Sequence, residues 1–246
     1  MRLDLYLVQA GLARSRTEAA DLIAEGAVTV EGRVRTKPAF PIDEATPVTA
    51  VAISRAAHPF VSRGGEKLAA ALAAFSLSPA GCVALDIGAS SGGFTDCLLQ
   101  NGATRVYALD VGEGQLVPSL ASDPRVISME HYNARFLRSE DFSPLPTFAT
   151  MDVSFISQTL ILPALAALLP DGSPFVTLIK PQFEVGRDGI GKGGIVRDAR
   201  LRELAVTRVV AAAEAVGLSH LGTIDSPILG KDGNHEFLAA FIRRSK

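Results

Sequence analysis

The sequence has little cysteine, little net charge and no long apolar run, and each shortage excludes a class of protein. Two cysteines in 246 residues, Cys82 and Cys97, are too few for a disulfide scaffold and lack the paired spacing of a zinc site. The longest apolar stretch, 160–169, is interrupted by Pro163 and has about half the length of a membrane span. We therefore expect a cytoplasmic protein with no metal and no membrane partner.

The charge and the composition indicate a folded protein. The formal net charge is −2, so the surface is not basic throughout, and any contact with nucleic acid must be local. Hydrophobic residues make up 48% and charged residues 20%, close to the globular average, which excludes wholesale disorder. At about 150 residues per domain, the length predicts one large domain or a large one with a small one.

The first part of the chain is predicted to be a small α+β unit. Helical spacing of apolar residues predicts helices over 3–10 and 15–25. Alternating apolar residues over 28–37, with Glu31 and Gly32 between them, predict a hairpin. Basic residues gather at the entrance of the second helix and on the hairpin, which by itself favours an ordinary solvated surface.

A longer pattern in this unit favours contact with RNA. Residues 2–32 read R-L-D-L, then G-L-A-x-S-R-x2-A-x2-L-I-x2-G-x-V-x-V-x-G, and they resemble the small S-four RNA-binding domain. The resemblance implies that five basic side chains of the unit face RNA phosphates, those of Arg14, Arg16, Arg33, Arg35 and Lys37. Arg2 and Arg63 complete the predicted RNA-binding set.

The rest of the chain is predicted to be a second domain of another class. Glycine, proline and small residues place a linker at 54–65, between a domain at 1–53 and one at 66–246. Apolar runs predict strands over 83–87, 105–111, 126–129, 148–153, 175–180, 220–225 and 236–242. Helices are predicted over 93–100, 158–169 and 199–216. This alternation predicts an α/β, Rossmann-like, mostly parallel sheet with helices on both faces, and the turn at 231–234 predicts an antiparallel edge strand at its end.

The first strand of this sheet runs into a glycine-rich turn, D-I-G-A-S-S-G-G-F-T-D, over 86–96. Its glycines allow a ligand to approach the main chain at the start of a helix. The spacing G-x-x-x-G-G differs from the G-x-G-x-x-G of dinucleotide sites and favours S-adenosylmethionine (SAM). Asp110, at the end of the second strand, is placed to bind both ribose hydroxyls of an adenosine, although a helix cap or a solvated carboxylate explains it too.

Asn133, after the third strand, is the candidate contact for the adenine edge. The full set of predicted cofactor residues is Asp86, Gly88, Ala89, Ser90, Ser91, Gly92, Gly93, Phe94, Asp110, Val111 and Asn133.

Four charged residues, Lys67, Asp152, Lys180 and Glu236, are the candidate catalytic groups. The last three each adjoin an apolar run that is predicted to be buried, and a buried charge is costly unless it is paired. Separate charges that cap strand ends are one interpretation, and a single site is the other.

The order lysine, aspartate, lysine, glutamate on a SAM-binding sheet resembles the FtsJ type of RNA ribose 2′-O-methyltransferase. The segments S-R-G-G-E-K-L, D-V-S-F-I-S, K-P-Q-F-E-V-G and G-x-G-G-I-V-R-D more closely resemble the TlyA family. The resemblance implies SAM-dependent 2′-O-methylation of a cytidine in ribosomal RNA, with that RNA or a ribosomal subunit, not DNA, as partner. Lys180 is then the base or the group that stabilises the alkoxide, and the carboxylates orient the lysines and the hydroxyl.

Other functions are compatible with parts of the pattern. A non-catalytic RNA-binding or ribosome assembly protein would keep the fold, but the four charged residues favour an enzyme. A cytolytic protein is suggested by the haemolysin label of some family members, although no spanning segment or basic amphipathic helix supports it. A dehydrogenase would need a different glycine spacing.

Overall fold

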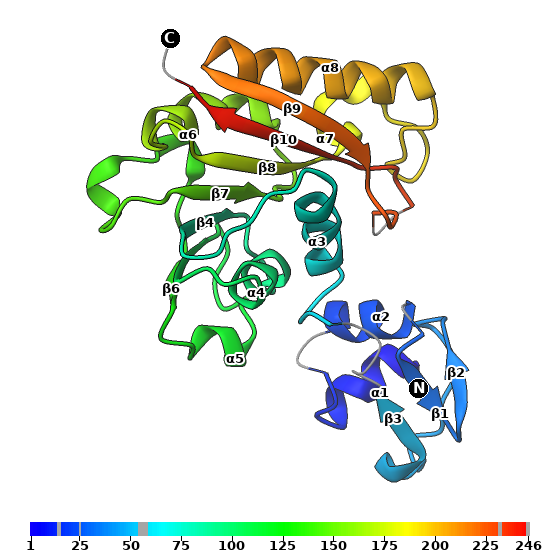
Figure 1. The fold of residues 1–246 in the computed structure, drawn as a ribbon. Helices are drawn as coiled ribbons and strands as arrows, with labels where there is room; N and C mark the ends of the chain where they lie inside the picture. The colour runs from blue at the N-terminus through cyan, green and yellow to red at the C-terminus, as the bar shows by residue number, and fades with distance from the viewer. Residues whose placement is uncertain (14–15, 25, 54–58, 231–232, 245–246) are drawn as a thin grey trace. The chain divides into compact units, whose positions relative to one another are not determined.

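The computed structural model describes residues 1–13, 16–24, 26–53, 59–230 and 233–244. The chain divides into two compact units, Met1–Pro59 and Phe60–Lys246, each with its own core (Figure 1). In the described ranges, no helix is both long enough and apolar enough to cross a bilayer.

The first unit packs two helices against a small antiparallel sheet. Its elements are α1 (Leu3–Gln9), α2 (Arg16–Ala24), β1 (Val28–Val30), β2 (Arg33–Arg35), η1 (Val48–Ala50) and β3 (Val51–Ile53). The predicted hairpin is present, and its Glu31 and Gly32 both have positive φ, 51° and 75°, as a tight two-residue turn between twisted strands requires. The strand β3, which the sequence did not predict, pairs with the other side of β1.

The second unit is built on a mixed sheet, which within the described residues has seven strands in the order β6-β5-β4-β7-β8-β10-β9. The strands are β4 (Val83–Ile87), β5 (Arg105–Leu109), β6 (Val126–Met129), β7 (Phe148–Met151), β8 (Pro174–Ile179), β9 (Leu218–Asp225) and β10 (Phe237–Arg243). The pairs among β6, β5, β4, β7 and β8 are parallel, and β10 is antiparallel to both β8 and β9. This sheet confirms the predicted Rossmann-like class.

The position of the last strand corrects the prediction of an antiparallel edge. The strand β10 is antiparallel, as expected, but it lies between β8 and β9, and β9 forms the edge. Residues 238–241 are fully buried, so this apolar run needs a neighbour on each side. The strand β9 is mostly half-exposed, which suits an edge.

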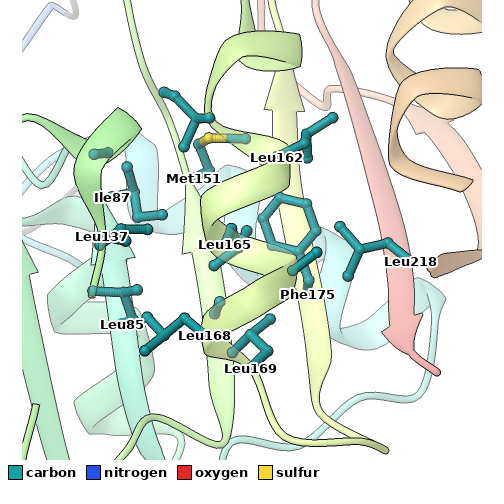
Figure 2. Close-up of a cluster of buried hydrophobic side chains, with 14 of the residues drawn as sticks. Leu85, Ile87, Leu137, Met151, Leu162, Leu165, Leu168, Leu169, Phe175 and Leu218 are labelled. Carbon is teal, nitrogen blue, oxygen red and sulfur yellow. The ribbon is translucent and has the colours of Figure 1, made fainter. Parts of the chain in front are cut away.

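Helices cover both faces of the sheet and enclose two apolar cores. The helices are α3 (Gly64–Ala74), α4 (Gly93–Gln100), α5 (Pro118–Ala121), α6 (Leu162–Leu168), α7 (Pro181–Glu184) and α8 (Ala199–Ala215). Short 3-10 turns follow at η3 (Ala134–Phe136), η4 (Ser139–Asp141), η5 (Gln158–Leu160) and η6 (Arg187–Gly189). Leu85 and Ile87 of β4 join the core under α6 (Figure 2), whereas Ala84 points to the core with α3 and α4, because strand side chains alternate between faces.

The strand order places a crevice near the middle of the sheet. From β4 the chain first builds outward through β5 and β6 and then returns to the other side of β4 with β7 and β8. At such a reversal, the loops after the carboxyl ends of the strands separate and leave room for a ligand. The segments after β4, β5, β7 and β8, and the segment before the antiparallel β10, therefore share one edge.

Candidate active site

The four charged residues predicted as catalytic form ion pairs at this edge. The Nζ atom of Lys67, on α3, lies 2.6 Å from Oε2 of Glu236, and the two side chains are only 11% and 3% exposed. The Nζ atom of Lys180, directly after β8, lies 2.6 Å from Oδ1 of Asp152, directly after β7. Each lysine thus contacts a carboxylate, a pairing that the sequence left open.

The sheet register brings the two pairs next to each other. In the antiparallel ladder, Phe237 of β10 faces Ile179 of β8. One step further along the same register, Glu236 comes opposite Lys180, and facing residues of an antiparallel pair have Cα atoms about 4.5–5.5 Å apart. Asp152, Lys180, Glu236 and Lys67 therefore follow one another in a row across the edge.

One hydrogen bond and one ion pair hold the ammonium group of Lys180. Nζ of Lys180 donates to Oγ of Ser154 at 3.0 Å. The contact with Asp152 is an ion pair without directional hydrogen-bond geometry, and Oδ1 of Asp152 is buried without a hydrogen-bond partner among the described residues. A buried carboxylate oxygen in this state retains the capacity to accept a hydrogen bond from a bound hydroxyl.

Two glycines of the loop after β4 are required by close backbone packing. Gly88 has φ of 82°, and a Cβ there would overlap the carbonyl oxygen of Asp152. A Cβ at Gly93 would overlap Oγ of Ser62 and come within 3.0 Å of the backbone nitrogen of Gly65, at the start of α3. These contacts bring the glycine-rich turn against two of the four segments that carry catalytic candidates, the one with Asp152 and the one with Lys67.

A hollow opens beside this turn, between the loops after β4, β5 and β6. Asp110 borders it and accepts two backbone hydrogen bonds, from Ser90 at 2.9 Å and from Gly112 at 2.8 Å. These bonds fix the carboxylate and tie the loop after β4 to the loop after β5. The lining residues are Ala89, Ser90, Ala108, Asp110, Gly112, Gln115, Leu116, Ser128 and Glu130.

Only some of the predicted cofactor residues belong to this lining. Ala89, Ser90 and Asp110 do, whereas Asp86, Gly88, Ser91, Gly92, Gly93, Phe94, Val111 and Asn133 are outside it. The side-chain oxygen of Asn133 accepts a hydrogen bond from the Arg135 amide and caps a 3-10 turn. Val111 is 69% exposed.

Asp86 lies beneath the loop. Its carboxylate is fully buried and accepts hydrogen bonds from the hydroxyls of Thr95 at 2.7 Å and Thr150 at 3.0 Å. Burial raises the pKa of Asp86 to about 7, and the charge of Asp152 acts in the same direction, while the two threonines oppose it. The residue therefore joins β4 to α4 and β7 from inside the sheet.

Several lining residues were missed in the sequence. Glu130 follows β6 as Asp110 follows β5, and its Oε1 accepts a hydrogen bond from the Gly114 amide at 2.8 Å. The strand-end rule that selected Asp110 would have selected Glu130 as well. Gln115 and Leu116 come from the loop D-V-G-E-G-Q-L, where no local feature distinguishes lining from solvent-facing residues.

The basic residues predicted to bind RNA have different surroundings in the first unit. Arg2 and Arg16 both bind the buried Asp4, at 2.9 and 3.2 Å, and these hydrogen bonds, that of Arg2 above all, lower the pKa of Asp4 to about 2. The guanidinium of Arg35 lies over the ring of Phe40 at 4.2 Å. Of the other basic residues predicted to bind RNA, Arg33 and Lys37 are exposed, and Arg14 lies outside the described residues.

Arg63 belongs to the second unit, where it is the residue before α3.

Comparison with known proteins identifies both units. Residues 1–47 match the S4 domain model, and residues 60–243 match the model of the FtsJ-like methyltransferases. The 16S/23S rRNA (cytidine-2′-O)-methyltransferase TlyA of Mycobacterium tuberculosis is 45% identical over 96% of this chain and 87% of its own length. The chain belongs to the TlyA family of FtsJ-like methyltransferases. The predicted family is thereby confirmed.

Solved structures agree with this family and with the fold. A chain of Streptococcus thermophilus that carries a hemolysin name has a TM-score of 0.80 and 46% identity, and the match covers 100% of this chain and 89% of that one. The Burkholderia thailandensis 1,6-didemethyltoxoflavin-N1-methyltransferase, solved with S-adenosylhomocysteine, has a TM-score of 0.53 at 19% identity over 75% of this chain and 80% of its own. This second likeness shows the methyltransferase fold alone.

Proposed function

We propose that this protein transfers the methyl group of SAM to the ribose 2′-hydroxyl of a cytidine in ribosomal RNA. The observation that carries the proposal is the row of Asp152, Lys180, Glu236 and Lys67 beside the glycine-rich turn. The name of the M. tuberculosis relative supports the substrate, since that protein acts on cytidine ribose in ribosomal RNA. The reaction then takes place in the cytoplasm, where ribosomal RNA is found.

The side chains of the row meet the needs of a sugar nucleophile. A ribose hydroxyl is weak until its proton leaves, so a catalyst must stabilise the oxyanion and hold it in line with the methyl group. Lys180 places a cation where this charge develops, and Ser154 and Asp152 hold its Nζ from two sides. Lys67 and Glu236 add a second pair behind it. The hydroxyl proton passes to solvent as the oxygen gains the methyl group, and the product is a neutral 2′-O-methyl ribose.

The residues that line the hollow near Asp110 have the chemistry to bind the adenosyl part of SAM. Asp110 offers a fixed carboxylate, and Glu130 offers another from the next loop, both groups that accept hydrogen bonds from ribose hydroxyls or an adenine amine. Apolar lining from Ala89, Ala108 and Leu116 suits the purine faces. When bound, SAM supplies an electrophilic methyl group and leaves as the neutral thioether.

The S4 unit supports RNA delivery to this site. It presents arginines whose guanidinium groups are held by Asp4 or by the ring of Phe40, which reduces the entropy lost when they bind phosphate.

A substrate with one altered sugar tests the nucleophile. We expect RNA that carries 2′-deoxycytidine at the target to accept no methyl group, because the attacking oxygen is missing. The target is first mapped by reverse-transcription stops on ribosomal RNA treated with the protein and SAM. Transfer of tritiated methyl is then compared between this RNA and one with the deoxy sugar at the neighbouring nucleotide. Equal labelling of the two substrates would exclude the 2′-hydroxyl as acceptor.

Loss of the Asp110 carboxylate tests the cofactor site. We expect Asp110→Ala to weaken SAM binding about 10- to 100-fold, since hydrogen bonds to a charged group contribute about 1.5–3 kcal/mol. Isothermal titration measures the Kd, and Asp171→Ala, a change at an exposed aspartate in the turn before β8, is the control. Unchanged affinity in Asp110→Ala would place the adenosyl group elsewhere.

A further inference from the structure

The loop after β7 and the helix after β8 are bound together along their length. The loop, residues 152–158, carries Asp152 and Ser154, which hold Lys180. Further along, the rings of Phe155 and Phe183 lie 5.2 Å apart. At the far end, the side chain of Glu184 accepts hydrogen bonds from the last two residues of the loop. The catalytic contacts thus lie at one end of this interface and Glu184 at the other.

Glu184 holds the far end with both of its oxygens. Its Oε2 accepts a hydrogen bond from Oγ of Ser157 at 2.6 Å, and its Oε1 accepts one from the backbone amide of Gln158 at 2.9 Å. The residue is 2% exposed. The backbone carbonyl of Glu184 accepts a hydrogen bond from the side chain of Arg208 on α8 at 2.9 Å, and this bond fixes the backbone that carries the carboxylate.

The next residue extends the same network into the sheet. The side chain of Gln158 accepts from the hydroxyl of Thr177 at 2.8 Å and donates to the carbonyl of Leu178, both in β8. The hydroxyl of Thr177 also lies 3.2 Å from the carbonyl of Met151, the last residue of β7. The end of the loop is therefore tied to the two strands that lead to Asp152 and Lys180.

The middle of the loop needs such support. Phe155 has φ of 64°, in the left-handed region that a bulky residue adopts only when its surroundings hold it there, and it is 92% exposed. Because solvent surrounds nearly all of this ring, the backbone of Phe155 is held, among the described residues, only by the two ends of the loop and by the contact with Phe183. One end is the Lys180 contact itself, so the restraint that is independent of the reacting groups comes from Phe183 and from the other end, where Glu184 binds both Ser157 and Gln158.

We propose that Glu184 is a positioning residue for methyl transfer, which holds loop 152–158 so that Asp152 and Ser154 aim the ammonium group of Lys180. The role rests on the proposed function, in which Lys180 stabilises the oxyanion. A displacement of about 1 Å in a catalytic group costs up to about 100-fold in rate, which is the scale on which a lost restraint acts.

Substitutions at Glu184 separate positioning from folding. We expect Glu184→Ala to lower kcat about 10- to 100-fold while the Kd for SAM stays within about twofold, because the hollow at Asp110 is bordered by other loops. Glu184→Gln recovers most of kcat, since its amide accepts from Gln158 and donates to Ser157. Ser157→Ala lowers kcat less, and adds little to the loss in the Glu184→Ala background.

Hydrogen exchange measures directly whether Glu184 restrains the loop, and it does not depend on the enzyme assay. Hydrogen exchange of the full chain should be faster in residues 153–158 of Glu184→Ala and unchanged in residues 86–93. Glu203→Ala, an exposed position on α8, is the matched control. Unaltered exchange in 153–158, or equal losses of kcat and SAM affinity, would overturn the positioning role. Absence of methyl transfer by the unmodified protein would overturn the proposed function instead, and the exchange result would still stand.

Discussion

Lys180→Ala should abolish methyl transfer while SAM still binds. Removal of the ammonium group leaves the developing oxyanion without its nearest cation, and a charged or proton-transferring group at this position contributes about 10²- to 10⁴-fold to rate. The side chain is 13% exposed and is held by Asp152 and Ser154 outside the hollow at Asp110, so the Kd for SAM should change less than about twofold. Single-turnover transfer to ribosomal RNA and isothermal titration measure the two quantities.

A second substitution at the same position controls for lost packing. Lys180→Met keeps most of the volume of the side chain and removes only its charge, so we expect the same loss of transfer as in Lys180→Ala. Turnover close to that of the unmodified protein in either variant would remove Lys180 from the mechanism. A parallel loss of SAM affinity would instead assign Lys180 to the cofactor site.

Glu236→Ala should destabilise the methyltransferase unit strongly. Lys67 is 11% exposed and its Nζ lies 2.6 Å from the Glu236 carboxylate, so the substitution leaves a nearly buried ammonium without its counter-charge. Breaking one side of a buried ion pair costs about 3–5 kcal/mol of the free energy of unfolding. Urea denaturation of the full chain, followed by far-UV circular dichroism, should show an earlier transition for this variant.

Replacement of both partners distinguishes stability from catalysis. In Lys67→Met with Glu236→Leu, neither charge is buried alone, and well-packed apolar pairs are often as stable as the ion pair that they replace. We expect the double variant to recover at least half of the lost free energy of unfolding and none of the methyl transfer. A Glu236→Ala variant as stable as the unmodified protein would mean that Lys67 reaches water.

Much of the fold was predictable because its elements are encoded locally. The predicted strands at 83–87 and 126–129 and the helix at 93–100 match β4, β6 and α4 to the residue, since apolar runs end where glycine or charge begins. The strand β3 was missed because V-A-I is too short to show alternation. The predicted edge position of β10 was wrong because the neighbours of a strand in a sheet depend on contacts between distant residues, which the sequence of a turn does not determine.

The sequence by itself determined the candidate site to the level of residue types. Asp110, Asp152 and Lys180 each follow a strand, and the carboxyl ends of parallel strands meet at one edge whatever the order of the strands. The family followed in the same way, from motifs that are continuous in the chain. Such features depend on a few neighbouring residues.

Only the tertiary structure decided which groups meet. The register of β10 against β8 brings Glu236 opposite Lys180. The helix α3, which packs closely against Gly93, carries Lys67 to within ion-pair distance of Glu236. Other long-range contacts bury Asp86 between α4 and β7 and bond Glu184 to the segment that follows β7. These contacts join residues far apart in the chain, and their geometry depends on strand order and helix placement, which no short pattern contains.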